Sequence, residues 1–147
     1  MAAGCDGPSN VESYWAPGAG LETGWASYSW AVKEASNVPR KELDQLLHQL
    51  IDERLAQKGY IKAEHANPDL FLRIRVAKWV QQAETGTDSW DQAVLAVEMV
   101  DPLNNALVWR GSAQLRVEYS ATPEQRRARA SKVVDAILKK FPSRRMR

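Results

Sequence analysis

Four arginines and one tryptophan alternate along two segments of the chain in a pattern that suits anion binding. They are Arg73, Arg75, Trp79, Arg110 and Arg116. Because successive side chains of a β-strand point to opposite faces, the odd positions of residues 70–80 and the even positions of residues 107–118 would each project from one side of a sheet. Guanidinium groups beside aromatic rings, here Trp79 and Phe71, suit the recognition of a carboxylate, phosphate or sugar. These five residues form the candidate binding face.

A solvated surface is the competing interpretation of the same residues, and it is the commoner outcome. Arginine stems often lie over neighbouring rings while the charged heads stay in water. Glu98 and Glu118 fall on the same face and would neutralise part of its charge. The pattern alone therefore favours an ordinary solvated face.

The sequence lacks the residue spacing of a metal or nucleotide site. His48 and His65, the only histidines, lie on different elements and without the ligand spacing of a zinc site. Gly18, Gly20 and Gly24 do not have the spacing of a dinucleotide-binding loop. We therefore expect neither a metal nor a cofactor.

Residues for acid–base or nucleophilic catalysis are equally scattered. Asp88 and Asp91 fall in a polar segment, residues 81–91, which we interpret as a loop. Carboxyl groups need a walled pocket to acquire the shifted pKa values of catalytic acids and bases. No serine lies in a strand–turn–helix elbow. The protein is therefore predicted not to be an enzyme.

The single cysteine, Cys5, follows Ala2, Ala3 and Gly4. This order of small residues before a cysteine is seen where a lipoprotein signal peptide is cleaved and the cysteine becomes the lipidated first residue. No charged and apolar leader precedes Cys5 in the chain. One hypothesis is a lipid anchor on Cys5, and the alternative is that Met1 is the true start and the thiol has no role.

Size and composition indicate one globular domain. The chain has 147 residues, of which 44% are hydrophobic and 26% charged. From Ser120 onward nine basic residues oppose two acidic ones, a net charge of +7, so the rest of the chain carries −5 of the overall +2. The basic stripe of this last segment (Arg129, Lys132, Lys139 and Lys140) could contact anionic lipid, although a solvated helix back is commoner.

Hydrophobic periodicity predicts the elements that would position these residues. Helical spacing covers residues 39–58, with Asn37 or the serine before it as the N-cap, and residues 122–141, which open with a capping box between Thr122 and Gln125. Alternating apolar residues predict strands over residues 11–15, 26–32, 60–64, 70–80, 93–101 and 107–118.

The predicted fold class is α+β, a single antiparallel β-sheet of about five to six strands with two α-helices packed on one face. Residues 1–10 would form a tether after the lipidation motif, residues 11–142 the domain, and residues 143–147 a basic tail.

Several short motifs occur in an order that resembles a known family. They are Cys5, the proline–glycine turn at 16–19, the aromatic residues Trp25, Tyr28 and Trp30, Lys-Gly-Tyr at 58–60, Asn-Pro-Asp-Leu at 67–70, Leu-Val-Trp-Arg-Gly-Ser-Ala at 107–113 and Phe-Pro at 141–142. This series is similar to the bacterial lipoproteins built on domain of unknown function 4136, and it runs from Cys5 to Pro142. The resemblance implies an exported, membrane-anchored α+β domain with Cys5 as the lipidated residue, and it implies no established activity.

We therefore expect a non-enzymatic cell-envelope lipoprotein domain that faces the periplasm and is lipid-anchored to the inner or outer membrane. Its partner would be an envelope protein or other envelope component, bound through the candidate binding face or the loop around Trp90, and no nucleic acid is expected. One alternative is a cytoplasmic binding module for an acidic partner or nucleic acid. Another is a small-ligand carrier with a cleft between sheet and helices.

Overall fold

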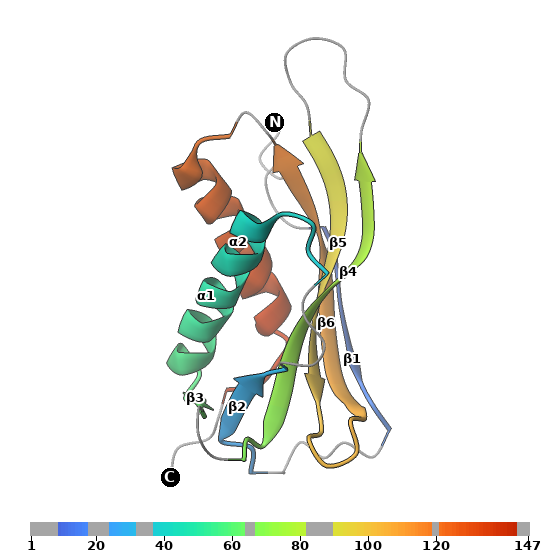
Figure 1. Cartoon of the computed structure of the whole chain (residues 1–147), viewed down its shortest axis with the longest axis vertical. Coiled ribbons are helices and arrows are strands. Elements are labelled where there is room, and N and C mark those ends of the chain that lie inside the picture. The colour runs from blue at the N-terminus through green and yellow to red at the C-terminus, as the bar shows by residue number, and fades with distance from the viewer. Residues whose placement is uncertain are drawn as a thin grey trace.

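In the computed structural model, the described residues form one sheet of six strands with two helices packed on one side of it (Figure 1). The structure describes residues 9–17, 24–31, 37–63, 67–81, 90–118 and 121–143. In chain order the elements are β1 (Ser9–Trp15), β2 (Ser27–Trp30), α1 (Lys41–Gln57), β3 (Ile61–Lys62), β4 (Leu70–Gln81), β5 (Trp90–Val100), β6 (Leu107–Glu118) and α2 (Pro123–Leu138). The α+β class is confirmed, and β1 begins at Ser9, inside the segment predicted as a tether.

The sheet is mixed, so the prediction of a purely antiparallel sheet was wrong. The strand order is β1-β6-β5-β4-β2-β3, in which β1, β6, β5 and β4 pair antiparallel while β2 runs parallel to both β3 and β4. Between β2 and β3 the chain crosses over through α1, and such a crossover returns it to the same end of the sheet. Alternation of side chains reveals which face a residue occupies but not the direction of its strand. The order strand–helix–strand was the signal that could have predicted the parallel pairs.

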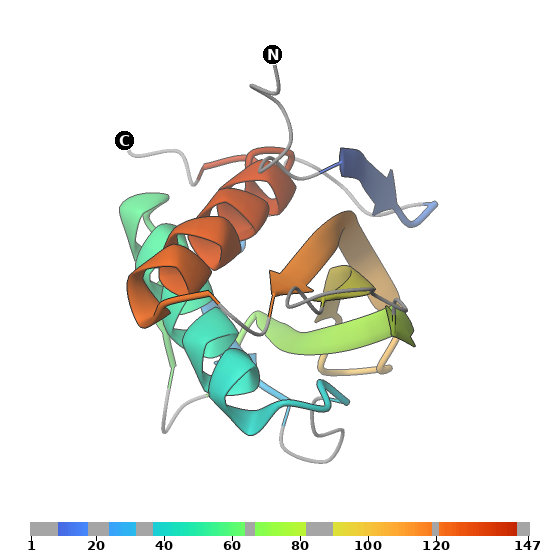
Figure 2. The same ribbon diagram turned by 90° about the horizontal axis from the view of Figure 1, so that it is seen from above.

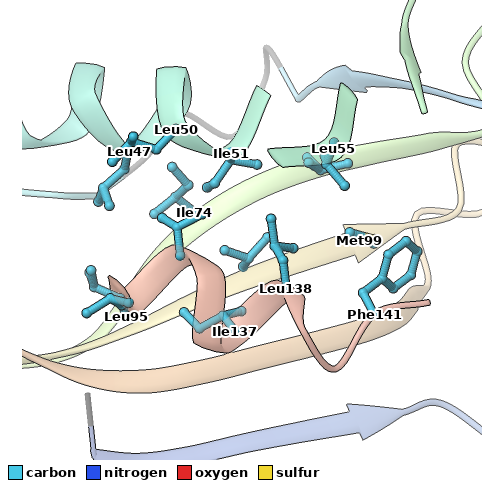
Figure 3. Close-up of a cluster of buried hydrophobic side chains, with 14 of the residues drawn as sticks. Leu47, Leu50, Ile51, Leu55, Ile74, Leu95, Met99, Ile137, Leu138 and Phe141 are labelled. Atoms are coloured by element: carbon cyan, nitrogen blue, oxygen red, sulfur yellow. The ribbon is translucent and has the colours of Figure 1, made fainter. Parts of the chain in front are cut away.

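The apolar stripes of both helices face the sheet and build the core (Figure 3). The helices lie side by side against one face of the curved sheet (Figure 2), and both begin at the same end of the molecule (Figure 1). Arg54 Nε donates to Asp135 Oδ1 at 2.7 Å and joins their later turns. The core residues labelled in Figure 3 are Leu47, Leu50, Ile51 and Leu55 of α1, Ile137, Leu138 and Phe141 from α2 and its end, and Ile74, Leu95 and Met99 of the sheet.

The two helices begin differently. Thr122 Oγ1 accepts a hydrogen bond from the Gln125 amide, and the Gln125 side chain accepts one from the Thr122 amide, which confirms the predicted capping box. At α1 the N-cap position belongs to Arg40, whose side chain makes no capping bond, so the prediction of Asn37 as the cap was wrong. Asn37 instead pairs with the backbone of Val76, which donates to Oδ1 at 2.6 Å.

Asp52 of α1 accepts hydrogen bonds that join β2 to the helix. Its Oδ1 accepts hydrogen bonds from the Tyr28 hydroxyl at 2.7 Å and from Trp30 Nε1 at 3.0 Å. Its Oδ2 lies 3.3 Å from Lys62 Nζ of β3. Burial and, to a smaller extent, the Asp52 carboxylate raise the pKa of Tyr28 well above its ordinary value. This network ties both parallel strands to the crossover helix that connects them.

An aromatic cluster closes the end of the core opposite the first turns of the helices. It consists of Trp15, Trp25, Tyr60, Trp109 and Phe141. Trp15 and Trp25 stack with ring centroids 6.2 Å apart and planes 7° apart, and Trp109 meets Phe141 at 5.1 Å. The Tyr60 hydroxyl donates to the Pro142 carbonyl at 2.8 Å. The cluster therefore joins β1 to the residues that follow α2.

Candidate functional site

Three of the predicted arginines converge on one carboxylate on the sheet face away from the helices. Glu98 lies in register between Arg73 of β4 and Arg110 of β6, and paired residues on neighbouring strands project from the same face. Arg73 Nε lies 2.5 Å from Glu98 Oε1, Arg75 Nε lies 3.8 Å from that oxygen, and Arg110 Nε lies 3.5 Å from Oε2. We call these four residues the Glu98 cluster.

The members of the Glu98 cluster differ in their exposure to solvent. Three guanidinium groups lie within 4 Å of one carboxylate. Glu98 and Arg73 are sheltered, with only 13% and 16% of their side chains exposed, whereas more than a third of each of Arg75 and Arg110 is exposed. The inner pair therefore holds the cluster in place, and the two outer arginines can contact an anion from solvent.

Tyr14 of β1 adds an aromatic residue to this surface. It lies opposite Arg110 in the β1–β6 register, and 51% of it is exposed. Tyr14 was not predicted to belong to this surface, because only the pairing of β1 with β6 brings it beside the arginines. Such long-range pairing leaves no local pattern in the sequence.

Trp79 does not share the face of these arginines. The β4–β5 register shifts between Val76 and Lys78, and beyond this irregularity Trp79 lies opposite Ala93, a core residue on the helix side. Its Nε1 donates to Asp91 Oδ2 at 2.7 Å. The prediction from alternation was wrong here, because one extra residue in a strand moves every later side chain to the opposite face of the sheet. Asp91 is correspondingly 2% exposed within β5, and not part of a polar loop as predicted.

Arg116 lies apart from the Glu98 cluster, near the end of β6. Its Nε lies 2.8 Å from Glu118 Oε2, and Glu118 Oε1 also accepts from Arg129 of α2 at 2.9 Å. Of the predicted face, the structure thus gathers Arg73, Arg75 and Arg110 but neither Arg116 nor Trp79.

Several other predicted residues have different or undescribed positions. Trp90 is the first residue of β5, whereas the sequence analysis placed it in a loop. His48 lies on α1, where its ring contacts that of Trp30 with centroids 4.0 Å apart. Cys5, His65, Asp88 and the basic residues 144–147 lie outside the described residues.

The described part of the chain contains neither a cluster of metal-ligating side chains nor a membrane-spanning helix. No three or more histidine, cysteine, aspartate or glutamate side chains gather there as they would around a metal ion. None of the helices found in those residues has the length and apolar character needed to cross a membrane.

Comparison with protein families shows to which family the chain belongs. The family model described as "Domain of unknown function (DUF4136)" matches residues 13–143. The chain belongs to the DUF4136 family. This match begins within β1, ends five residues after α2 and confirms the resemblance seen in the sequence. No curated protein matches the chain by sequence.

Solved structures share the DUF4136 fold at low sequence identity. PelC from Paraburkholderia phytofirmans, described as a dodecamer, matches with a TM-score of 0.64 and 17% identity over 92% of this chain and 98% of that one. A PDZ domain protein from Parabacteroides distasonis matches with a TM-score of 0.64 and 10% identity over 92% of this chain and 36% of its own. The lipoprotein GNA1162 from Neisseria meningitidis matches with a TM-score of 0.52 and 19% identity over 78% and 99% of the two chains. At these identities the comparisons establish the fold alone.

Proposed function

We propose that this DUF4136 domain is a non-enzymatic, lipid-anchored module of the bacterial cell envelope that binds an anionic envelope component through the Glu98 cluster and Tyr14. The lipid would be attached to Cys5 and the domain would face the periplasm. The observation that carries the binding proposal is the convergence of three arginines on one carboxylate on the sheet face away from the helices, with more than a third of Arg75 and of Arg110 exposed to solvent.

The geometry of the cluster supports recognition of carboxylate or phosphate groups. Arg75 of β4 and Arg110 of β6 flank the sheltered Arg73–Glu98 pair, so their guanidinium groups are held on two strands separated by β5 before any partner binds. Side chains that are ordered in advance lose less conformational entropy on binding. Tyr14 beside Arg110 offers an exposed ring with a hydroxyl, a combination common at interfaces.

The anchor proposal draws on the small residues before Cys5 and on the lipoprotein from Neisseria meningitidis that shares the fold. Metabolic labelling with a radiolabelled fatty acid tests it in a bacterium that expresses the protein from its own gene. We expect the protein to carry label and the Cys5→Ala variant to carry none, while an Asp6→Ala variant keeps it. Absence of label from the unmodified protein would refute the anchor.

Photo-crosslinking tests the binding surface. A photoreactive amino acid in place of Tyr14 should capture a discrete envelope component in living cells. The Arg75→Gln/Arg110→Gln double variant should reduce that capture about tenfold, since two charge-assisted contacts are removed. Lys132→Gln, which removes an exposed charge from α2, is the control and should leave capture unchanged. Equal capture by all three proteins would return the Glu98 cluster to the role of an ordinary solvated surface.

A further inference from the structure

A second surface, unrelated to the Glu98 cluster, is a cleft of about 530 Å³ between the first turns of the two helices and the end of β6. This volume is within the range of roughly 300–1,000 Å³ that is usual for small-molecule sites. The cleft opens on the helix side of the sheet, whereas the Glu98 cluster lies on the other face. Its walls come from three elements that are distant in sequence.

The floor of the cleft is apolar. Leu115 and Ala130 are buried, whereas Leu43, Leu46 and Val117 are only partly buried and pack against the core from its edge. Those three side chains therefore present hydrocarbon to the open space of the cleft. A ligand that covered them would remove apolar surface from water, which favours binding.

The rim of the cleft is strongly basic. Two glutamates, Glu42 and Glu118, oppose its five arginines, so the lining carries a net charge of +3; the arginines are Arg40, Arg116, Arg126, Arg127 and Arg129. Glu118 is already engaged by both Arg116 and Arg129.

Arg126 and Arg127, the two most exposed arginines of α2, make only weak interactions with the rest of the protein. Arg126 Nε donates to the Ala121 carbonyl at 3.1 Å, and an Arg127 nitrogen lies 3.5 Å from Glu53 Oε2 on the surface. A carbonyl leaves the Arg126 charge unneutralised, and an exposed ion pair of that length contributes little. The rim can therefore turn positive charge toward an incoming ligand.

We propose that this cleft binds a single-chain anionic amphiphile, with the hydrocarbon chain over Leu43, Leu46 and Val117 and a carboxylate or phosphate head at the arginines. An apolar floor next to a basic rim matches the two ends of such a molecule. A small inorganic anion would leave the floor exposed, and an uncharged chain would make no charge-assisted contact with Arg126 or Arg127.

Titration calorimetry of the full chain with dodecyl compounds below their micelle concentrations tests the ligand class. Dodecanoate and dodecyl phosphate should each bind once per chain, about tenfold or more tightly than dodecyl maltoside or inorganic phosphate. Preference between the two anions distinguishes a fatty acid from a phospholipid-like head group. Equal binding of dodecyl maltoside would overturn the role of the arginines, and equal binding of inorganic phosphate would overturn that of the floor.

Matched variants locate the site. Arg126→Gln/Arg127→Gln should weaken dodecanoate binding about tenfold and leave dodecyl maltoside unaffected, because only the head-group contact is lost. Lys132→Gln/Lys139→Gln removes two exposed charges of the same segment outside the cleft and should change neither affinity. An equal loss in both double variants would mean attraction by net charge only and would refute the cleft.

The apolar floor has its own pair of variants. Leu46→Gln should weaken binding of both dodecyl anions, whereas Leu103→Gln, in the exposed turn between β5 and β6, should not. Thermal unfolding monitors whether each variant is folded. NMR chemical shifts of backbone amides in the unmodified protein provide a measurement that needs no variant. Addition of dodecanoate should change the shifts of residues 43–46, 115–118 and 126–130. Shifts confined to other residues would contradict the proposal.

Discussion

Gly111 shows at the scale of one residue how tightly the helix side of the sheet is packed. A Cβ at this position would collide with the Trp109 ring and lie 2.7 Å from Ile137 Cγ2. Both neighbours are fully buried, so neither can move aside cheaply. Glycine is required here because β6 and α2 approach each other closely.

Gly111→Ala should therefore destabilise the domain by about 1–3 kcal/mol, the range typical of overpacked cores. Urea unfolding measures the difference in the free energy of unfolding. Gly24→Ala is the matched control, since a Cβ there would meet no atom within 4 Å. Equal stability of the Gly111→Ala variant and the unmodified protein would show that β6 and α2 can separate more easily than their packing indicates.

Tyr28 makes the stability of the folded domain depend on pH in the alkaline range. Its raised pKa keeps it protonated in the folded chain, whereas in the unfolded chain a tyrosine loses its proton near pH 10. The unfolded state then binds fewer protons than the folded one, so this contribution to stability is complete below about pH 10 and is lost as the pH rises further. Burial, together with the hydrogen bond to Asp52, is the cause.

Urea unfolding at a series of pH values tests this coupling with the Tyr28→Phe variant. Near pH 7 the variant should be less stable by about 1 kcal/mol, because the bond to Asp52 is missing. Between about pH 9 and 11 the unmodified protein should lose stability more steeply, so the two curves should converge. Parallel curves over this interval would exclude Tyr28 as the titrating group.

Among single residues, local rules predicted the arginines of the Glu98 cluster but not Trp79. Arg73 and Arg75 precede the register shift of β4, and Arg110 follows the β5–β6 shift between Leu107 and Trp109, so each alternates with core residues in a regular stretch and period-2 spacing was sufficient. Trp79 follows the register shift at Val76, which depends on pairing with β5 and has no local signal. Tyr14 could be placed only with knowledge of a partner strand about two thirds of the chain length away.

At the scale of elements, the start of α2 is stabilised by its own sequence. The reciprocal bonds between Thr122 and Gln125 satisfy two backbone donors that a helix terminus otherwise leaves unpaired. Thr122→Ala should lower the free energy of unfolding by about 1 kcal/mol, whereas Thr122→Ser should preserve it. Thermal unfolding compares the two, and equal melting temperatures for both variants would show that tertiary contacts alone hold this helix end.

Helices and strands were predictable as elements because their periodicity is local, whereas the arrangement of β2 was not. Both predicted helices exist, and every predicted strand has a counterpart. The parallel placement of β2 depends on α1 crossing over and on the Asp52 network that joins Tyr28, Trp30 and Lys62. Asn37 was misassigned as a helix cap because the backbone of Val76 competes for its side chain.

At the scale of the whole molecule, Phe141 connects the last helix with the first strand. Its ring contacts Trp15, Trp25, Tyr60 and Trp109, and it is fully buried. Phe141→Ala should cost about 3–5 kcal/mol, which is a large share of the stability of a domain this size. Urea unfolding of this variant should show a single transition, at a lower urea concentration than in the unmodified protein, by both tryptophan fluorescence and circular dichroism. Separate transitions for the two signals would mean that the aromatic end unfolds on its own.

The contact between Trp15 and Phe141 also has a consequence for how the chain acquires its shape. During synthesis β1 is made first, whereas β6, with which it pairs, and Phe141, which contacts Trp15, are made near the end. Native contacts between such distant segments slow folding, because a long loop has to close first. A newly made chain of this topology therefore reaches its native structure later than one whose neighbours in sequence are also neighbours in space, and until then Trp15 lacks the rings that pack against it in the folded domain.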